Sequence, residues 1–280
     1  MPMVPGAVYS CEDTPNNPMD AAKMGKTPYW EAIGSLMYAS VATCPDITFT
    51  VSTLLQFLKN PRIAHWEAVK QTFCYLSRTK AYQLTYGTES NDLIGYTDVD
   101  SANQEHCCAI SGNVFLIDGG VVSWSSWKQE LVTLSTVEAE YVAAMHVVKE
   151  AIWLCKLILE LFLVPATPMP LYCDNQAALT LASVDNYHAC TKHIDVQYHF
   201  IQDIIKKGSI SLIYCSTEDM MADTLTKPLP KWKTTLHNLS LGLHHVCRGV
   251  AELALPETKE GCHSNVEHPE AQGLAFASPA

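Results

Sequence analysis

A long amphipathic segment, Thr136 to Phe162, constrains the fold of this chain more than any other stretch. At about 100° per residue, Glu140 falls in line with Val147 and Ala151, which predicts one long helix with an apolar stripe. A helix of this kind is stable when its stripe packs against another layer of structure. The segments before and after it must therefore supply that layer.

Short apolar runs on both sides of this helix read as strands. The expected strands are Leu93–Thr97, Asn113–Ile117, Val121–Trp124, Leu171–Cys173 and Ile210–Tyr214. The glycine pair Gly119-Gly120 between the second and third runs predicts an antiparallel hairpin. Further helices are expected from Asn175, around Asp195–Lys206 and around Asp219–Thr226. Strands followed by alternating helices and strands predict a mixed α/β sheet.

Periodicity and composition divide the chain into four segments. Residues 1–27 read as a flexible lead-in, 28–90 as a small helical unit, 91–242 as the α/β domain and 243–280 as a disordered tail. The helical unit is predicted from helical spacing over Tyr29–Tyr38 and Trp66–Leu76, and from a third apolar segment over Asp46–Leu58.

Composition excludes several classes of protein. Hydrophobic residues make up 48% of the 280 residues and charged residues 17%, which is a globular composition. The formal net charge of -11 argues against a purely electrostatic nucleic-acid binder, but it permits an enzyme that meets phosphates through metal ions. We find no signal peptide and no apolar run of about 18 residues that could span a membrane.

The 11 cysteines do not form a metal or disulfide pattern. No CxxC pairing occurs, so neither a disulfide framework nor a zinc ribbon is predicted. His188, Cys190 and His193 could be imagined as a metal clip, but a second pair of ligands is missing.

Four acidic residues occupy positions where burial of an unpaired carboxylate would be unfavourable. Asp98 and Asp174 each end an apolar strand, Glu140 lies on the apolar stripe, and Asp223 has apolar neighbours on both sides. Gathered in one place, four carboxylates would repel each other unless divalent cations neutralised them. Mg²⁺ prefers such oxygens, and two ions roughly 3.5–4 Å apart can clamp a phosphodiester. Spacing alone thus favours a metal-dependent phosphotransferase; the alternative for each Asp taken singly is a helix cap or a turn former.

The chain resembles the C-terminal part of copia-type LTR retrotransposon polyproteins, the end of reverse transcriptase followed by ribonuclease H. The motifs that carry the resemblance are YTDVD from Tyr96, VSW from Val122, KQ from Lys128, LSTVEAEYVAA from Leu134, YCDNQAA from Tyr172, TKHID from Thr191, YHF from Tyr198 and ADTLTKPL from Ala222. Upstream, IGSLMY from Ile33 and HWEAV from His65 resemble the segment that links the polymerase to ribonuclease H.

The resemblance implies an RNase H-like fold, a mixed five-stranded sheet flanked by helices and preceded here by a small helical segment. It implies that Asp98, Glu140, Asp174 and Asp223 are both catalytic residues and metal ligands for two Mg²⁺ ions, with Mn²⁺ as an alternative. The expected reaction is endonucleolytic hydrolysis of the RNA strand of an RNA–DNA hybrid. Lys192 and His193 match the family's substrate-side motif; the alternative for His193 is a structural histidine.

The same resemblance sets expectations about partners. An RNA–DNA hybrid is the expected substrate, the polymerase portion of reverse transcriptase is a candidate protein partner, and no membrane is involved. The residues include no polymerase palm motif, so we expect no DNA synthesis. The default compartment is the cytoplasm, with the nucleus as an alternative.

Two other functions stay open. Cysteine or glutamine stands at several positions where the family usually has arginine: Cys44, Cys74, Cys107, Cys108, Cys190 and Gln202. Single codon changes produce this pattern, which is typical of a decayed element copy, and each lost arginine weakens phosphate binding. The first alternative is therefore a catalytically decayed remnant that at most binds nucleic acid weakly. The second is an unrelated metal-dependent phosphohydrolase.

Overall fold

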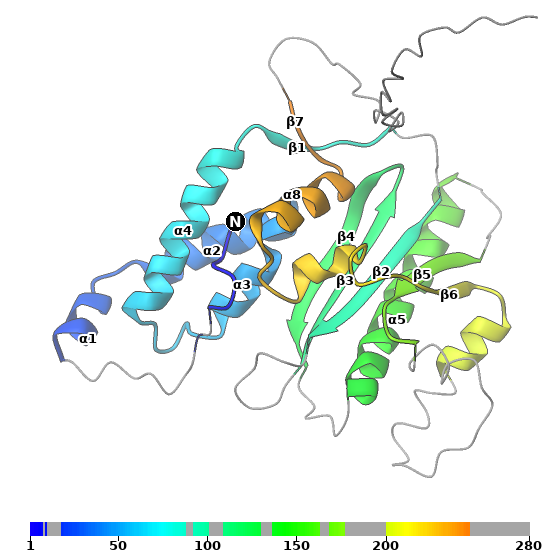
Figure 1. Ribbon diagram of the computed structural model, residues 1–280, viewed down its shortest axis with the longest axis horizontal. Helices are drawn as coiled ribbons and strands as arrows, with labels where there is room; N and C mark the ends of the chain where they lie inside the picture. The colour runs from blue at the N-terminus through cyan, green and yellow to red at the C-terminus, as the bar shows by residue number, and fades with distance from the viewer. Residues whose placement is uncertain are drawn as a thin grey trace, which may run out of the picture. The chain divides into compact units, whose positions relative to one another are not determined.

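The computed structural model describes residues 1–7, 9, 18–87, 92–100, 109–129, 136–162, 168–176 and 200–246 (Figure 1). Residues Met1–Val246 form one compact unit. Three expectations fall partly or wholly outside the described residues: the helix after Asn175 beyond Gln176, the start of the Asp195–Lys206 helix, and the tail beyond Val246.

Five strands form a mixed sheet. They are β2 (Ile94–Asp100), β3 (Ile110–Ile117), β4 (Gly120–Lys128), β5 (Met169–Cys173) and β6 (Ile210–Tyr214). The strand order is β4-β3-β2-β5-β6; β2, β3 and β4 pair antiparallel, whereas β2, β5 and β6 pair parallel (Figure 1). The fold is RNase H-like, and the predicted mixed five-stranded sheet flanked by helices is confirmed.

The predicted hairpin joins β3 to β4 through a turn at Asp118 and Gly119. Both residues have positive φ, 53° and 76°, as a two-residue hairpin turn requires. Gly120 pairs with Ile117 and already belongs to β4, so the turn lies one residue earlier than the glycine pair predicted. Asp supports the left-handed conformation that this turn needs.

The long helix α5 runs over Thr136–Phe162, as predicted. Val147 and Ala151 of the apolar stripe are fully buried, and α5 contacts β2 and β3. Lys149, on the opposite side, is exposed. The core on this face of the sheet consists of Leu93, Phe115, Met145, Val147, Val148, Ala151, Leu154, Met169, Leu171, Ile201 and Ile210. Within the described residues, no helix is long and apolar enough to cross a membrane.

A short 3-10 helix, η2 (Met221–Leu225), and the helix α8 (Lys231–Ser240) follow β6. Leu225 and Leu241 pack against Val114 and Val121, which alternate with the residues that face α5. The prediction of a helix over Asp219–Thr226 holds only as this short 3-10 helix, because Pro228 ends it. Helix α8 was not predicted, since its buried side chains include Thr234, His237 and Asn238 rather than an apolar stripe.

The helical segment forms a second core. Its elements are α1 (Pro18–Met24), α2 (Tyr29–Ala42), η1 (Pro45–Ile47), α3 (Thr48–Leu55) and α4 (Ile63–Thr79). The side chains that fill this core are those of Met24, Tyr29, Ile33, Leu36, Ile47, Val51, Leu54, Ala68, Val69 and Tyr75. The lead-in is ordered in part, because Met3 is buried against Phe49 and Ile110.

Hydrogen bonds and a small sheet join the helical segment to the α/β part. The Trp124 indole N–H donates to the Ser40 carbonyl oxygen at 2.8 Å, and the Ser52 hydroxyl donates to the Ser126 carbonyl oxygen at 2.7 Å. Strand β1 (Tyr82–Leu84) pairs antiparallel with β7 (Leu243–His245). The ordered chain thus enters the range expected to be a disordered tail, since Leu243 is buried.

Candidate functional site

Asp98 lies on the central strand β2, and the residue is 2% exposed. The Thr226 hydroxyl donates a hydrogen bond to Asp98 Oδ2. The Lys227 ammonium lies 3.7 Å from the same oxygen. The buried carboxylate of Asp98 therefore receives its hydrogen bond and its counter-charge from Thr226 and Lys227, two consecutive residues that follow η2.

Gly112 makes this close approach of η2 and its following residues possible. It pairs directly with Asp98 across the β2–β3 ladder. A Cβ atom at position 112 would lie 2.8 Å from both Leu225 Cβ and Thr226 Cγ2. A glycine inside a strand often marks such an approach of another backbone. Any larger residue would push η2 away from Asp98.

Asp223, on η2, is fully buried and holds two lysines. The Lys227 ammonium lies 2.7 Å from Asp223 Oδ1, and the Lys233 ammonium lies 2.6 Å from Oδ2. Lys227 thereby bridges Asp223 and Asp98, while Lys233 reaches Asp223 from α8. Two carboxylates from a strand and a helix thus share one cationic network.

Asp174 enters the same neighbourhood from β5. The parallel register pairs Thr97 with Cys173, so Asp98 and Asp174 follow paired positions on adjacent strands. Asp174 is half-buried, and its Oδ2 accepts a hydrogen bond of 3.0 Å from the Thr217 hydroxyl. The Thr217 carbonyl oxygen in turn accepts a hydrogen bond from Lys233 at 2.9 Å. Thr217 therefore connects Asp174 to the lysine that holds Asp223.

The electrostatics show that these three acids are close enough to interact. The pKa of Asp98 is raised to about 7, mainly by burial and further by the charges of Asp223 and Asp174, while Lys227 and Thr226 oppose the shift. Burial lowers the pKa of Lys227, but the neighbouring carboxylates of Asp98 and Asp223 outweigh burial and raise it overall. Asp98, Asp174, Asp223 and Lys227 therefore interact as one charged cluster.

The remaining sequence-predicted residues lie outside what the structure describes in detail. Glu140 belongs to α5, but its side chain is not among the described ones. Lys192 and His193 lie in the stretch 177–199, outside the described residues. The structure thus brings Asp98, Asp174 and Asp223 together, and Glu140, Lys192 and His193 stay predictions.

The donor chemistry of the site fits divalent cations, although its present arrangement is closed around lysine. Carboxylate oxygens are the ligands that Mg²⁺ and Mn²⁺ prefer. Among the described side chains, no three acids, histidines or cysteines are grouped so that they could hold a metal ion as they stand. The ammonium groups of Lys227 and Lys233 supply the positive charge that the carboxylates require.

Several residues of the network were not predicted from the sequence to belong to the site: Gly112, Thr217, Thr226, Lys227 and Lys233. Thr226 and Lys227 stand in the motif ADTLTKPL, so a closer reading of that motif could have found them. Gly112 directly precedes the predicted strand Asn113–Ile117, and only the longer observed strand β3 places it inside a strand. Lys233 carries no local signal, because only the fold of α8 brings it to Asp223.

Comparisons with known proteins place the chain among retrotransposon polyproteins. It is 42% identical over 231 residues to a retrovirus-related Pol polyprotein from transposon TNT 1-94 of Nicotiana tabacum, covering 82% of this chain and 17% of that protein. It is 33% identical over 232 residues to the corresponding polyprotein from transposon RE2 of Arabidopsis thaliana, covering 81% of this chain and 16% of that protein. No model of a known protein family matches the chain.

A solved structure, LC11-RNase H1 isolated from compost by a metagenomic approach, matches with a TM-score of 0.38 and 18% identity, over 49% of this chain and 93% of that one. These values are low, and the fold assignment rests on the order and directions of the five strands. The chain spans less than a fifth of the polyproteins it matches. On the sequence identity to those polyproteins, the chain belongs to the copia-type retrotransposon Pol polyproteins.

Proposed function

We propose that this chain contains a ribonuclease H-type endonuclease domain that hydrolyses the RNA strand of RNA–DNA hybrids. The observation that carries the proposal is the gathering of Asp98, Asp174 and Asp223 in one polar network. Asp98 lies on β2, Asp174 directly follows β5 and Asp223 lies on η2, so these acids come from segments far apart in sequence. Buried clusters of like charge with perturbed pKa values are typical of functional sites.

In this proposal Asp98, Asp174, Asp223 and Glu140 hold two Mg²⁺ ions, and Mn²⁺ can replace Mg²⁺. Bound ions would supply Lewis-acid chemistry at the scissile phosphodiester. The hydroxyls of Thr226 and Thr217 orient the carboxylates of Asp98 and Asp174 by donating to one oxygen of each. Lys192 and His193 contact the substrate, and recognition of the hybrid uses its shape and 2′-hydroxyls.

A hybrid-cleavage assay with Mg²⁺ tests the proposal. We expect the chain to cut the RNA strand and Asp174→Asn to lose that activity. Asp203→Asn is the matched control, because Asp203 is an exposed acid that pairs with the exposed Lys207. If the unaltered chain and Asp174→Asn both leave the RNA intact, this chain is not an active nuclease.

The lysine pairs of Asp223 favour a second candidate, a decayed remnant that binds hybrids without cutting them. Both oxygens of Asp223 are engaged by ammonium groups. The net charge of -11 predicts that such binding is weak and falls with added salt. Hybrid binding without turnover, measured at two salt concentrations, would support this candidate over the enzyme.

A further inference from the structure

We infer that Lys233 is a built-in counter-ion that competes with divalent metal ions for Asp223, and so lowers the metal affinity of the site. This inference rests on the proposed function, because it assigns a role toward the same metal ions. It adds a residue of α8 that neither the sequence motifs nor the predicted acids include.

The contacts of Lys233 are those of a held cation. Its ammonium lies 2.6 Å from Asp223 Oδ2 and donates to the Thr217 carbonyl oxygen at 2.9 Å. The lysine side chain is only 13% exposed, and the Asp223 side chain is fully buried. Two acceptors and partial burial fix the ammonium where a metal ion would otherwise contact Asp223.

A metal ion and Lys233 cannot occupy this position together. Mg²⁺ contacts carboxylate oxygens at about 2.0–2.1 Å, which would place it close to an ammonium already bound to the same oxygen. Two positive charges at such a separation repel strongly in a partly buried site. The second oxygen of Asp223 offers no alternative, because Lys227 lies 2.7 Å from it.

Lys233 is also connected to a second acid of the cluster. Thr217 accepts from Lys233 through its carbonyl oxygen and donates to Asp174 through its hydroxyl. The three described carboxylates and the two lysines carry a formal charge of -1, from three negative and two positive groups. Removal of Lys233 changes that charge to -2 and frees one oxygen of Asp223, and both changes favour a divalent cation.

A purely structural role for the Lys233–Asp223 ion pair predicts a different effect on metal affinity. If Lys233 only stabilises the fold, its removal lowers the melting temperature and leaves metal affinity unchanged or weaker. If Lys233 competes with metal, its removal tightens metal binding even though the metal-free protein melts earlier. Stability alone therefore does not separate the two readings, but metal affinity does.

The experiment titrates the full chain with MnCl₂ by isothermal calorimetry, and follows thermal unfolding with and without the metal. The variants are Lys233→Met, Lys233→Arg and Lys231→Met, a control at an exposed lysine on the same helix. We expect Lys233→Met to bind Mn²⁺ at least roughly fivefold more tightly and to gain a larger metal-induced rise in melting temperature. Lys233→Arg and Lys231→Met should bind as the unaltered chain does.

Asp174→Asn in the same titration separates the role of Lys233 from the proposed nuclease function. Unchanged or weaker binding by Lys233→Met, with Asp174-dependent binding by the unaltered chain, would overturn the role of Lys233 and leave the proposed nuclease standing. Absence of Mn²⁺ binding in every variant, or binding that ignores Asp174→Asn, would overturn both.

Discussion

Asp46 in the helical segment and Asp98 in the sheet are both buried carboxylates, but they are held in different ways. Asp46, on η1, is 6% exposed and accepts a hydrogen bond of 2.5 Å from the Tyr75 hydroxyl. That hydroxyl in turn accepts a hydrogen bond of 2.9 Å from the side-chain amide of Asn238. Burial raises the pKa of Asp46, and the Tyr75 hydrogen bond opposes the shift.

Asp98 instead lies among other charges. Its neighbours include Lys227 and the acids Asp223 and Asp174, both of which raise its pKa. Asp46 is a single buried acid satisfied mainly by neutral donors, whereas Asp98 belongs to a cluster of like charge. Burial is thus common to both acids, whereas the neighbouring acids distinguish Asp98 from Asp46, and such a cluster is the arrangement expected of a functional site.

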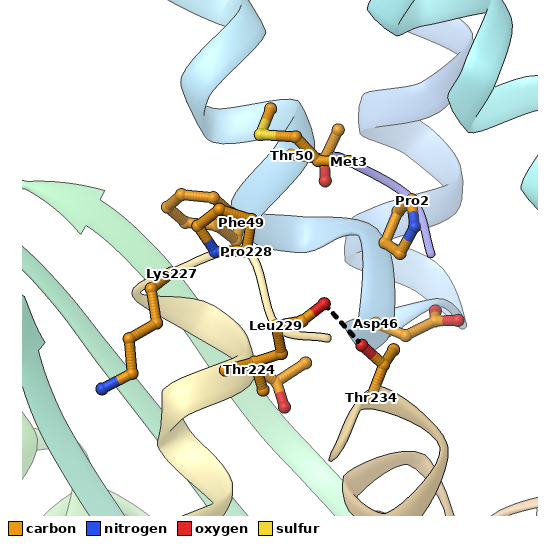
Figure 2. A pocket seen from close by; sticks show the side chains of 10 residues that line it. All are labelled: Pro2, Met3, Asp46, Phe49, Thr50, Thr224, Lys227, Pro228, Leu229 and Thr234. Carbon is orange, nitrogen blue, oxygen red and sulfur yellow. Dashed lines mark hydrogen bonds between the residues drawn. The ribbon is translucent and has the colours of Figure 1, made fainter. Parts of the chain in front are cut away.

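The Asp46 network extends from the helical segment toward the elements around the site. A small pocket between η1, α3 and the stretch after η2 is lined by Asp46, Phe49, Lys227 and Leu229, among others (Figure 2). Figure 2 shows the Lys227 ammonium directed away from this pocket. Asn238 belongs to α8, the helix that carries Lys233. The hydrogen bonds from Asp46 through Tyr75 to Asn238 thus reach the helix that carries Lys233.

The largest expected difference between Asp98 and Asp46 is the effect of their substitution on hybrid cleavage. We expect Asp98→Asn to lower hybrid cleavage by roughly 10²–10³-fold, since the proposed function makes Asp98 a metal ligand and such an interaction is worth several kcal/mol. Asp46→Asn should leave the rate per folded molecule within about threefold, because Asp46 is hydrogen-bonded to Tyr75 rather than to one of the clustered acids. Single-turnover cleavage, with the folded fraction measured by circular dichroism, makes the comparison; equal losses would remove the distinction.

The next largest effect concerns stability of the Asp46 network. Tyr75→Phe removes the donor to Asp46 and the acceptor of Asn238, so it should lower the free energy of unfolding by about 1–3 kcal/mol. Tyr38→Phe is the control, because Tyr38 is 78% exposed. Urea unfolding measures both; a Tyr75→Phe variant as stable as Tyr38→Phe would show that the network contributes nothing to the fold.

A pH dependence of stability sharpens the comparison further. The pKa of Asp98 is raised from 3.8 to about 7, so the folded state binds this proton more tightly than the unfolded state does. The contribution of Asp98 to stability is full below about pH 4 and is lost as the pH rises to about 7. In metal-free buffer, Asp98→Asn should therefore be more stable than the unaltered chain at pH 8, by on the order of 1–2 kcal/mol, with no gain near pH 4. Melting curves across this range that run parallel would contradict it.

The smallest effect is expected at an exposed ion pair. Lys207 and Asp203 lie 2.6 Å apart with both side chains more than half exposed, so Lys207→Gln should cost no more than about 0.5 kcal/mol. Lys227→Gln leaves Asp98 and Asp223 short of positive charge in a buried site and should cost clearly more. Thermal unfolding of Lys207→Gln and Lys227→Gln measures the two losses of stability. A larger loss in Lys207→Gln would show that Lys227 does not stabilise the acid cluster.

Much of the fold could be predicted from local patterns. The boundaries of α5 and β6 agree with the predicted ones, because an apolar stripe and a short apolar run are visible in consecutive residues. The stretch β1 and the helix α8 could not be predicted in this way. Strand β1 pairs with β7 more than 150 residues later, and α8 buries polar residues whose partners are remote in sequence.

The sequence by itself determined α5, the order of the five sheet strands along the chain and the candidate acids, since strand ends, helix faces and motifs depend on neighbouring residues. Only the tertiary structure decided which cations hold those acids. Gly112 admits η2 against β3, and α8 returns Lys233 to Asp223, through contacts between segments that the sequence separates. Ion pairing depends on distances of a few ångströms across the fold, and no local pattern specifies such distances.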